Sequence, residues 1–269
     1  MIKFFRHIRK SLIQENKMGK YFKYAIGEII LVVFGILIAL QINNWNIKRL
    51  NRIEENVILR NLEKDLLVEL KTIEVHKEGQ EVWINSCTEI LKHFDQNNGF
   101  KADDNLMQNI NDLFIRYGYL PNLTTFSTLE NTGKLDLIKN KALKDSITVY
   151  YLDLISFSGN TNNNNETLVD ELINQNLLGL TFFQANAFSK KMKDAWPLTN
   201  NNSPEIKNPV LLKNTVQTKL NNADNALLLI NAVNFRMLLA KIELDKVREL
   251  KSDTETLLET IRKALNNND

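Results

Sequence analysis

The stretch KYAIGEIILVVFGILIALQINNWN, residues 23–46, decides the fold. Residues 25–42 include 12 Ile, Leu, Val or Phe side chains and only two strongly polar ones. As a helix, these residues would be roughly 27 Å long, close to the ~30 Å hydrocarbon thickness of a bilayer. Their apolar side chains favour insertion by roughly 4 to 7 kcal/mol, which exceeds the penalty for one carboxylate, Glu28, near the boundary. We therefore predict a transmembrane helix over residues 25–44.

The flanks of this stretch support a retained membrane anchor. Tyr21 and Tyr24 on one side and Trp45 on the other lie where interfacial aromatic residues are common, so we predict them as interface anchors. A buried helix of a soluble protein would not explain these flanks. A cleaved signal peptide is disfavoured because the run is long and its exit, IALQINNWN, lacks a small-x-small cleavage site.

Basic residues predict the orientation of the helix. Seven lysines and arginines precede it, whereas four follow within the twenty residues after Ile42. The positive-inside bias then places the N-terminus in the cytoplasm, with a single pass and residues 45–269 on the far side.

The first 24 residues are predicted to form a cytoplasmic basic arm. Apolar residues recur there at helical spacing with basic residues between them, as expected for an amphipathic helix on an anionic lipid surface. The basic residues assigned to lipid contact are Lys3, Arg6, Arg9 and Lys10. Nucleic acid is not expected as a partner, because no base-reading module follows the arm.

Two features inside the span have more than one interpretation. Gly27, Gly35 and Ala39 form a small-residue face that would let another helix approach closely, although small residues are also common in membrane helices generally. The intramembrane carboxylate Glu28 suits the first turn of a helix, where the backbone dipole favours negative charge. Its expected role is anchoring or helix pairing, with proton transfer as the alternative.

Composition predicts an all-α protein. The chain has 269 residues, 43% hydrophobic and 25% charged, with a net charge of +2 that selects no particular class of partner. Nine glycines and four prolines are few for a turn-rich β fold. A single cysteine, Cys87, allows no intrachain disulfide.

Beyond the span, residues 45–95 contain no proline and predict one long juxtamembrane helix. Its apolar stripe consists of Ile58, Leu62, Leu66, Leu70 and Ile73. The sequence NNG at 97–99 is predicted to end this helix.

Further helices are expected along the rest of the chain. We predict a helix over 104–117, a short one from Thr124 to Gly133 capped by Thr124 or Thr125, and a long one over about 139–193. A loop over 196–209 precedes a last helix over about 210–265 with a break at 221–224. Asparagine clusters, such as NTNNNN at 160–165, are typical of solvated loops or helix ends. The simplest architecture is an extracytoplasmic antiparallel bundle of four or more helices.

No catalytic, cofactor or metal site is predicted. Glycine-rich phosphate loops and the H-E-x-x-H motif are absent from the sequence. His76, Cys87 and His93 are spaced 11 and 6 residues apart, which does not align them on one helix face. Cys87 is expected to be a small buried residue. We therefore expect a protein that is not an enzyme.

Two blocks resemble a known family. Residues 4–46, FFRHIRKSLIQENKMGKYFKYAIGEIILVVFGILIALQINNWN, resemble the signature of an uncharacterised family of single-span membrane proteins from Bacteroidota. Residues 125–151, TFSTLENTGKLDLIKNKALKDSITVYY, are similar to the second recurring block of that family. Phe34 departs from the smaller aliphatic residue expected there. The resemblance implies an inner-membrane location and a periplasmic helical domain, and it implies no activity.

The leading hypothesis is a single-pass inner-membrane protein without enzymatic activity. Its periplasmic bundle would bind a protein partner or a second copy of the chain, with the bilayer as its other contact. The first rival hypothesis is a ligand-sensing bundle that acts through a partner membrane protein. The second is an ion-driven component using Glu28. The third is a hydrolase, which would require His76, His93 or Cys87 to meet carboxylates in a cleft.

Overall fold

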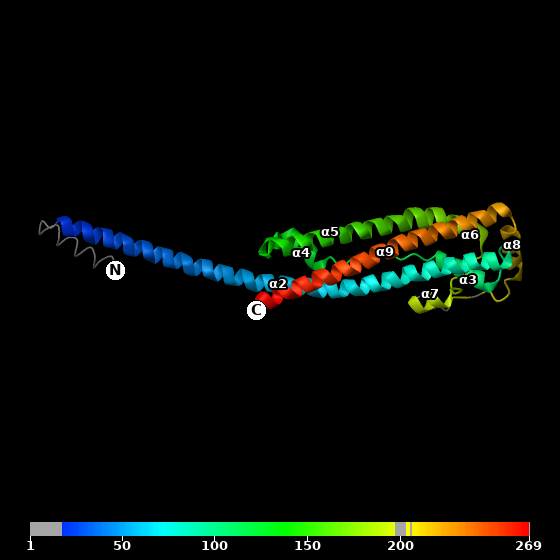
Figure 1. Ribbon diagram of the computed structural model, residues 1–269, viewed down its shortest axis with the longest axis horizontal. Coiled ribbons are helices and arrows are strands. Elements are labelled where there is room, and N and C mark those ends of the chain that lie inside the picture. Colours follow the sequence, from blue (N-terminus) through cyan, green and yellow to red (C-terminus); the bar gives the residue numbers. More distant parts are fainter. Residues whose placement is uncertain (1–17, 197–202, 205, 269) are drawn as a thin grey trace. The chain divides into compact units, whose positions relative to one another are not determined.

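The computed structural model describes residues 18–196, 203–204 and 206–268, and all regular structure within these ranges is helical (Figure 1). The predicted all-α class is confirmed for this part of the chain. The chain divides into two compact units, Met1–Val57 and Ile58–Asp269, which are described separately below as unit 1 and unit 2. Residues 1–17 of the predicted basic arm, with Lys3, Arg6, Arg9 and Lys10, lie outside the described residues, and residues 18–24 belong to the first helix.

Helix α2 spans Met18–Asn97, which confirms the predicted long helix over residues 45–95 and makes it continuous with the apolar stretch. No proline interrupts its hydrogen-bond ladder. It ends at the predicted NNG sequence, where Asn98 and Gly99 take positive φ angles of 50° and 144°. Asparagine and glycine tolerate this left-handed backbone better than other residues, so the stop signal is local.

Shorter elements follow in unit 2 and lead to a second long helix. They are α3 (Asp104–Leu113), α4 (Thr124–Thr132), the 3-10 turn η1 (Lys134–Leu137), α5 (Lys141–Asn164), the π-helix η2 (Asn165–Asn174), α6 (Gln175–Leu180), α7 (Lys190–Ala195), α8 (Val210–Leu220) and α9 (Ala223–Asn268). The predicted break at 221–224 is confirmed between α8 and α9, although it is only two residues long.

Two predicted helices are too long. The helix expected over 104–117 ends at Leu113, because side chains from other helices bind the carbonyl groups that follow it. The helix expected to reach about residue 193 ends at Leu180. There the Asn111 amide donates to the carbonyls of Gln184 and Ala187, at 3.1 and 2.9 Å, and so holds a non-helical loop.

The predicted ends of α4 are half right. Gly133 ends the helix in a left-handed conformation with φ 68°, as expected. The predicted cap by Thr124 or Thr125 is wrong, because the N-cap residue is Leu123 and has no side-chain cap. Instead, the backbone N–H of Thr125 donates to the Asp65 carboxylate of α2 at 2.9 Å. This partner is remote in sequence, so no local motif signals it.

The main core of unit 2 forms where α2, α4, α5 and α9 meet. The predicted stripe on α2 lies in it, with Leu62, Leu66 and Ile73 fully buried. Fully burying such a side chain is worth about 1.5–3 kcal/mol. Contacts between α2 and α9 pair Glu63 with Arg262 and Glu74 with Lys251, so the two helices run in opposite directions.

Two further hydrophobic clusters complete unit 2 near the C-terminal end of α2. One joins the C-terminal part of α2 with α3, η2, α6, α8 and the start of α9, around Ile90 and Leu229. The other packs Trp83 against Met192 of α7 and Phe188. Figure 1 shows α2, α5 and α9 as the long elements of this unit. They also position the polar side chains described next.

Candidate functional site

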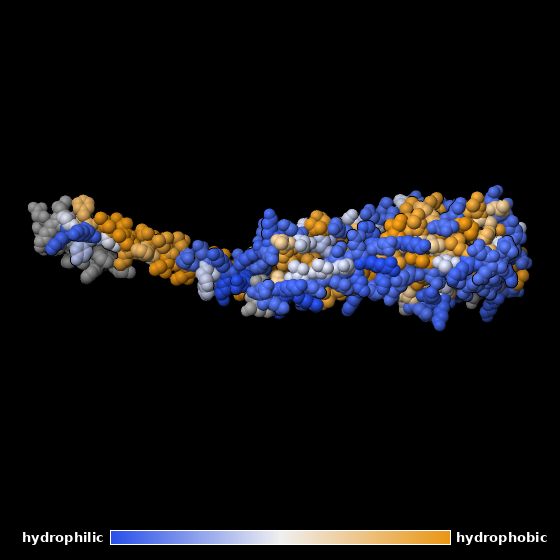
Figure 2. Space-filling view, in the orientation of Figure 1, coloured by the Kyte–Doolittle hydropathy of each residue, from blue (hydrophilic) through white to orange (hydrophobic). Residues whose placement is uncertain are grey.

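The apolar stretch of α2 is the first candidate site. Its best 18-residue window has a mean hydropathy of 2.5 and no residue buried within the structure. Within the described ranges, α2 is the one helix long and apolar enough to cross a membrane. Figure 2 shows the hydrophobic residues of this stretch as a nearly continuous surface.

The residues predicted to matter in this stretch all lie on α2 in unit 1. Large side chains such as those of Tyr24 and Trp45 are more than half exposed. A methyl group added at Gly27 or Gly35 would meet no atom within 4 Å, so nothing in the described chain requires glycine there. The side chain of Tyr21 is outside the described part.

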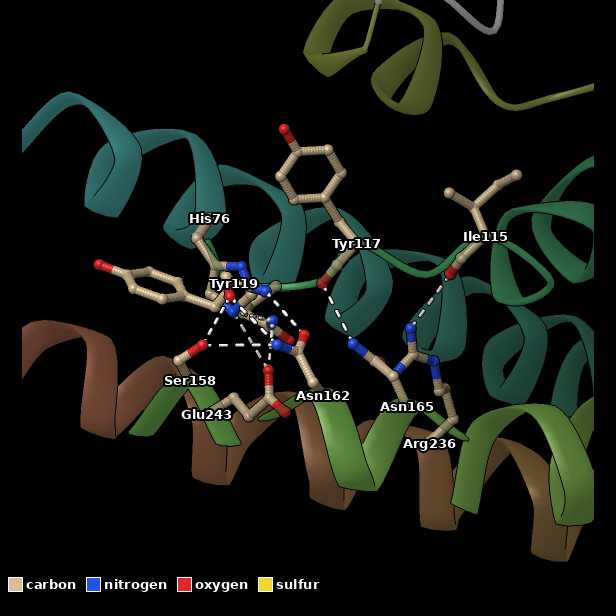
Figure 3. A network of polar contacts seen from close by, with 10 residues as sticks. His76, Ile115, Tyr117, Tyr119, Ser158, Asn162, Asn165, Arg236 and Glu243 are labelled. Atoms are coloured by element: carbon tan, nitrogen blue, oxygen red, sulfur yellow. Dashed lines mark hydrogen bonds and ion pairs between the residues drawn. The ribbon is translucent and has the colours of Figure 1, made fainter. Parts of the chain in front are cut away.

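A second candidate lies in unit 2, at residues 114–123 between α3 and α4, which we call the extended segment. It passes between helices without forming a sheet ladder, and side chains bind its backbone instead (Figure 3). We call these side chains the backbone clamp. The clamp consists of Ser158, Asn162, Asn165, Asn174 and Arg236.

The clamp binds the carbonyl groups of two alternate residues, Tyr117 and Tyr119, in the extended segment. Asn165 donates to the Tyr117 carbonyl at 3.2 Å, and Ser158 donates to the Tyr119 carbonyl at 2.8 Å. Asn162 binds both backbone groups of Tyr119: it accepts from the N–H at 3.1 Å and donates to the carbonyl at 3.2 Å. Buried backbone groups need such partners, so the clamp replaces the ladder that a neighbouring strand would supply.

Two more clamp contacts hold the start of the segment. Arg236 of α9 donates to the Ile115 carbonyl at 3.2 Å, and Asn174 donates to the Phe114 carbonyl at 3.5 Å. Gly118 leaves room for the clamp, because a Cβ atom there would lie 2.7 Å from the Asn162 amide oxygen. The segment is therefore held from α5, from η2 and from α9.

A buried carboxylate holds the other end of the segment. Glu69 of α2 accepts hydrogen bonds from the Tyr119 hydroxyl and from the Asn122 backbone N–H, the latter at 2.7 Å. Burial raises the pKa of Glu69 above its ordinary value, although these two hydrogen bonds oppose the shift. Burial, and then the neighbouring Glu69 charge, raise the pKa of Tyr119. The Tyr119 hydroxyl therefore keeps its proton and donates it to the Glu69 carboxylate.

His76 connects α2 to α9 beside the same segment. Its Nε2 lies 3.2 Å from a Glu243 carboxylate oxygen, to which Gln80 also donates at 2.8 Å. The ring meets Tyr119 edge to face, with centroids 5.2 Å apart. Glu243 also lines an open groove between α5 and α9 with a volume of about 570 Å³. His76 itself is buried, so only the carboxylate side of this pair reaches the groove.

The groove is lined by apolar and mostly acidic side chains. Phe157, Ile242 and Leu250 supply the apolar part. The charged residues that line it are Asp153, Glu243, Glu249, Asp253 and Lys246. Lys246 pairs with Glu249 at 2.7 Å, and the other three carboxylates leave the lining with a net negative charge.

A third polar cluster surrounds Arg236. Its guanidinium lies 4.1 Å from the Trp83 ring centroid, and burial lowers the pKa of Arg236 to about 10. Trp83 donates to the Asp112 carbonyl at 3.1 Å, and the Asp112 carboxylate accepts from Ser86 at 2.6 Å. Burial raises the pKa of Asp112. These contacts join α2, α3 and α9 and support the extended segment.

The other residues considered for chemistry are placed apart. Cys87 is fully buried, and burial raises the pKa of its thiol to about 12, so it stays protonated. His93 lies 3.0 Å from Asp103, the cap residue of α3. Among the described residues, no three His, Cys, Asp or Glu side chains gather as a metal site. Of His76, Cys87 and His93, only His76 contacts a carboxylate that lines the groove.

The contacts of the backbone clamp are not predictable from the local sequence. The asparagine cluster at 160–165 is typical of a solvated loop or helix end, yet it lies on α5 and η2 with Thr161 and Asn165 buried. A signal is present, since Ser158, Asn162 and Asn165 recur at intervals of four and three, on one face of a helix. Such spacing indicates a polar face but not that the face is buried.

Comparison with curated proteins and with solved structures found no match. One family model matches residues 28–175, which is more than half of the chain. The match begins at Glu28 in the apolar stretch and includes the extended segment together with Ser158, Asn162 and Asn165 of the clamp. The expectation of an uncharacterised family is confirmed at that level. The chain belongs to DUF6090, a family of unknown function.

Proposed function

We propose that the chain is a single-pass inner-membrane protein whose helical unit 2 acts in the periplasm through contact with other proteins. Residues 25–44 form the span, the N-terminus is cytoplasmic, and no reaction is assigned. The observation that carries the proposal is the exposed apolar stretch of α2, which has no buried residue in its most hydrophobic window. In water this surface would be strongly unfavourable, whereas in lipid it contributes roughly 4 to 7 kcal/mol to insertion.

The polar interior of unit 2 supports a binding role over a catalytic one. Several of its polar side chains bind the chain's own backbone, as Asn162, Glu69 and Arg236 do. Its outer faces retain large apolar residues that are at least half exposed, as expected for a surface that meets partners. On α5 and α9 these are Val149, Leu152, Leu238 and Ile242.

Two experiments test the anchor and the partner separately. Cell membranes washed at alkaline pH should retain the full-length protein, and a reporter enzyme fused after Asp269 should be active in the periplasm. Crosslinking in native membranes, followed by identification of the crosslinked chains, should recover a protein partner or a second copy. Protein released by the alkaline wash would refute the anchor. Recovery of uncrosslinked protein alone would refute the binding role.

A second candidate function is ligand sensing, which the groove between α5 and α9 favours. Its apolar and acidic lining suits a cation with an apolar part. Because Glu243 in this groove also holds His76 and Gln80 of α2, an occupant would act on two long helices. Spermidine is a suitable cationic probe. It should raise the unfolding temperature of the purified chain, and Asp153→Asn with Asp253→Asn should abolish that rise.

A further inference from the structure

A second apolar stripe lies on α2 between the proposed span and unit 2. Leu50, Ile53 and Val57 follow one another at intervals of three and four, and they are 50%, 51% and 52% exposed. In the proposed topology these residues lie beyond the span, so lipid does not cover them. Within unit 1, the described residues offer no other helix to pack on them.

The same spacing extends back into the span as a heptad repeat. With Leu50 and Val57 at the first position (a), Ile36 and Asn43 fall at a as well. The fourth position (d) is then occupied by Ala39, Asn46 and Ile53. We call this set of seven residues the α2 seam. Gly35 lies beside it, and since the described chain has no need of glycine at this position, a partner helix is a reason for its small size.

We propose that the α2 seam pairs with the same seam of a second copy, in parallel and in register. This inference rests on the proposed membrane anchor and names the partner of unit 1. Anchoring holds two copies in the same direction and at the same depth, so identical residues meet. Two heptads in water would pair weakly, but confinement to a membrane raises their effective concentration.

Charges beside the seam fit this arrangement. In a parallel pair, position g of one helix meets position e of the next heptad in its partner. Arg49 occupies g and Glu54 occupies e, so the two copies bring opposite charges together twice. Asn43 at an a position adds a polar contact of the kind that selects two parallel strands over other assemblies.

The seam ends where unit 2 begins. The next a and d positions are Arg60, Lys64 and Lys71, together with Leu67. In a parallel pair each of these cations would face its own counterpart and repel it. At the same point α2 turns its apolar residues Leu59, Leu62 and Leu66 into the core of its own unit. Pairing through α2 is therefore confined to residues 36–57.

Cysteine crosslinking of the full-length protein in native membranes tests the pairing. Leu50→Cys and Ile53→Cys place thiols on the seam, whereas Lys48→Cys and Arg52→Cys place them on exposed positions of the outer face. The native Cys87 is a built-in control, because it is buried and its thiol stays protonated. Mild oxidation should link the seam variants into dimers several-fold more than the outer variants.

A charge exchange provides a second readout without new thiols on the outer face. In the Ile53→Cys background, Arg49→Glu should reduce the dimer several-fold, and adding Glu54→Arg should restore it. Equal crosslinking at all four positions, or none in protein that resists alkaline extraction, would overturn the pairing and leave the anchor intact. Protein that is released by alkali would overturn both, since the pairing depends on the anchor.

Discussion

Helix α2 contains two apolar regions whose side chains are arranged differently around the helix. Between residues 26 and 42 apolar side chains cover every face of the helix, and all the large ones are exposed. Between residues 58 and 73 most of them form one stripe that is buried in the core of unit 2, while Leu67 and Val68 stay exposed. Uniform hydrophobicity suits a surrounding solvent such as lipid, whereas a stripe suits a neighbouring helix on one side. The difference lies in the arrangement of apolar residues rather than in their type.

The largest expected effect is the loss of membrane retention when charges are placed in the first region, residues 26–42. Val33→Lys with Leu37→Lys places two charges near the middle of the proposed span, at a cost of roughly 3 kcal/mol each. This cost cancels most of the insertion free energy, so the protein should leave the alkali-resistant membrane fraction. The matched control, Leu67→Lys with Val68→Lys, places the same charges on exposed positions of α2 in unit 2 and should remain in the membrane.

The next largest effect is a difference in the free energy of unfolding between substitutions in the two regions. Leu62→Ala should destabilise unit 2 by about 2–5 kcal/mol, because it leaves a cavity in a fully buried site. Leu37→Ala removes the same atoms from an exposed site of unit 1 and should leave the unfolding of unit 2 unchanged. Urea unfolding of the detergent-solubilised chain, followed by tryptophan fluorescence, measures both. Similar losses for the two variants would contradict the division into units.

A smaller effect sharpens the contrast within unit 2. Asn162→Ala should cost about 1–3 kcal/mol, because it leaves the buried N–H of Tyr119 without its acceptor. Asn163→Ala, one residue along on the exposed side, should change the free energy of unfolding by less than about 0.5 kcal/mol. Gly118→Ala should resemble Asn162→Ala, since its new methyl group displaces the same amide. If Asn162→Ala and Asn163→Ala behave alike, the clamp does not hold the segment.

The pH dependence of stability tests the buried carboxylate Glu69. Its pKa in the folded state is raised above the ordinary 4.5, so the folded protein binds this proton more tightly than the unfolded chain does. The resulting stabilisation is present below pH 4.5 and is lost as the pH rises through the folded-state pKa. Glu69→Gln should therefore remove part of the fall in stability on that alkaline side. Parallel pH profiles for the two proteins would refute the raised pKa.

The smallest effect concerns the carboxylate in the span. Glu28→Gln keeps the shape of the side chain and removes its charge, so membrane retention and seam crosslinking should stay as in the unchanged protein. The measurement is the same alkaline extraction and oxidation assay. A loss of growth or of assembly specific to this variant would instead favour an ion-driven role for Glu28.

Features set by neighbouring residues were predictable from the sequence. The apolar stretch, the NNG end of α2 and the Gly133 end of α4 each depend on a few adjacent positions. Features set across the fold were not. The cap of α4 comes from Asp65, which lies 60 positions away in sequence. Asn162 and Asn165 look solvent-facing in the sequence, because only the presence of the extended segment gives their amides a buried backbone to bind.

The pairing of α2 with α9 has a consequence for how the chain is made. Glu63 and Arg262 bond across 199 positions, so the first long helix of unit 2 contacts the last one synthesised. Long-range contacts of this kind slow folding, because a large loop must close before they form. During synthesis the stripe at Leu62 and Leu66 therefore emerges well before α9 exists to cover it. The emerging chain needs a temporary shield for this surface, and in the proposed topology periplasmic chaperones should bind it until α9 has crossed the membrane.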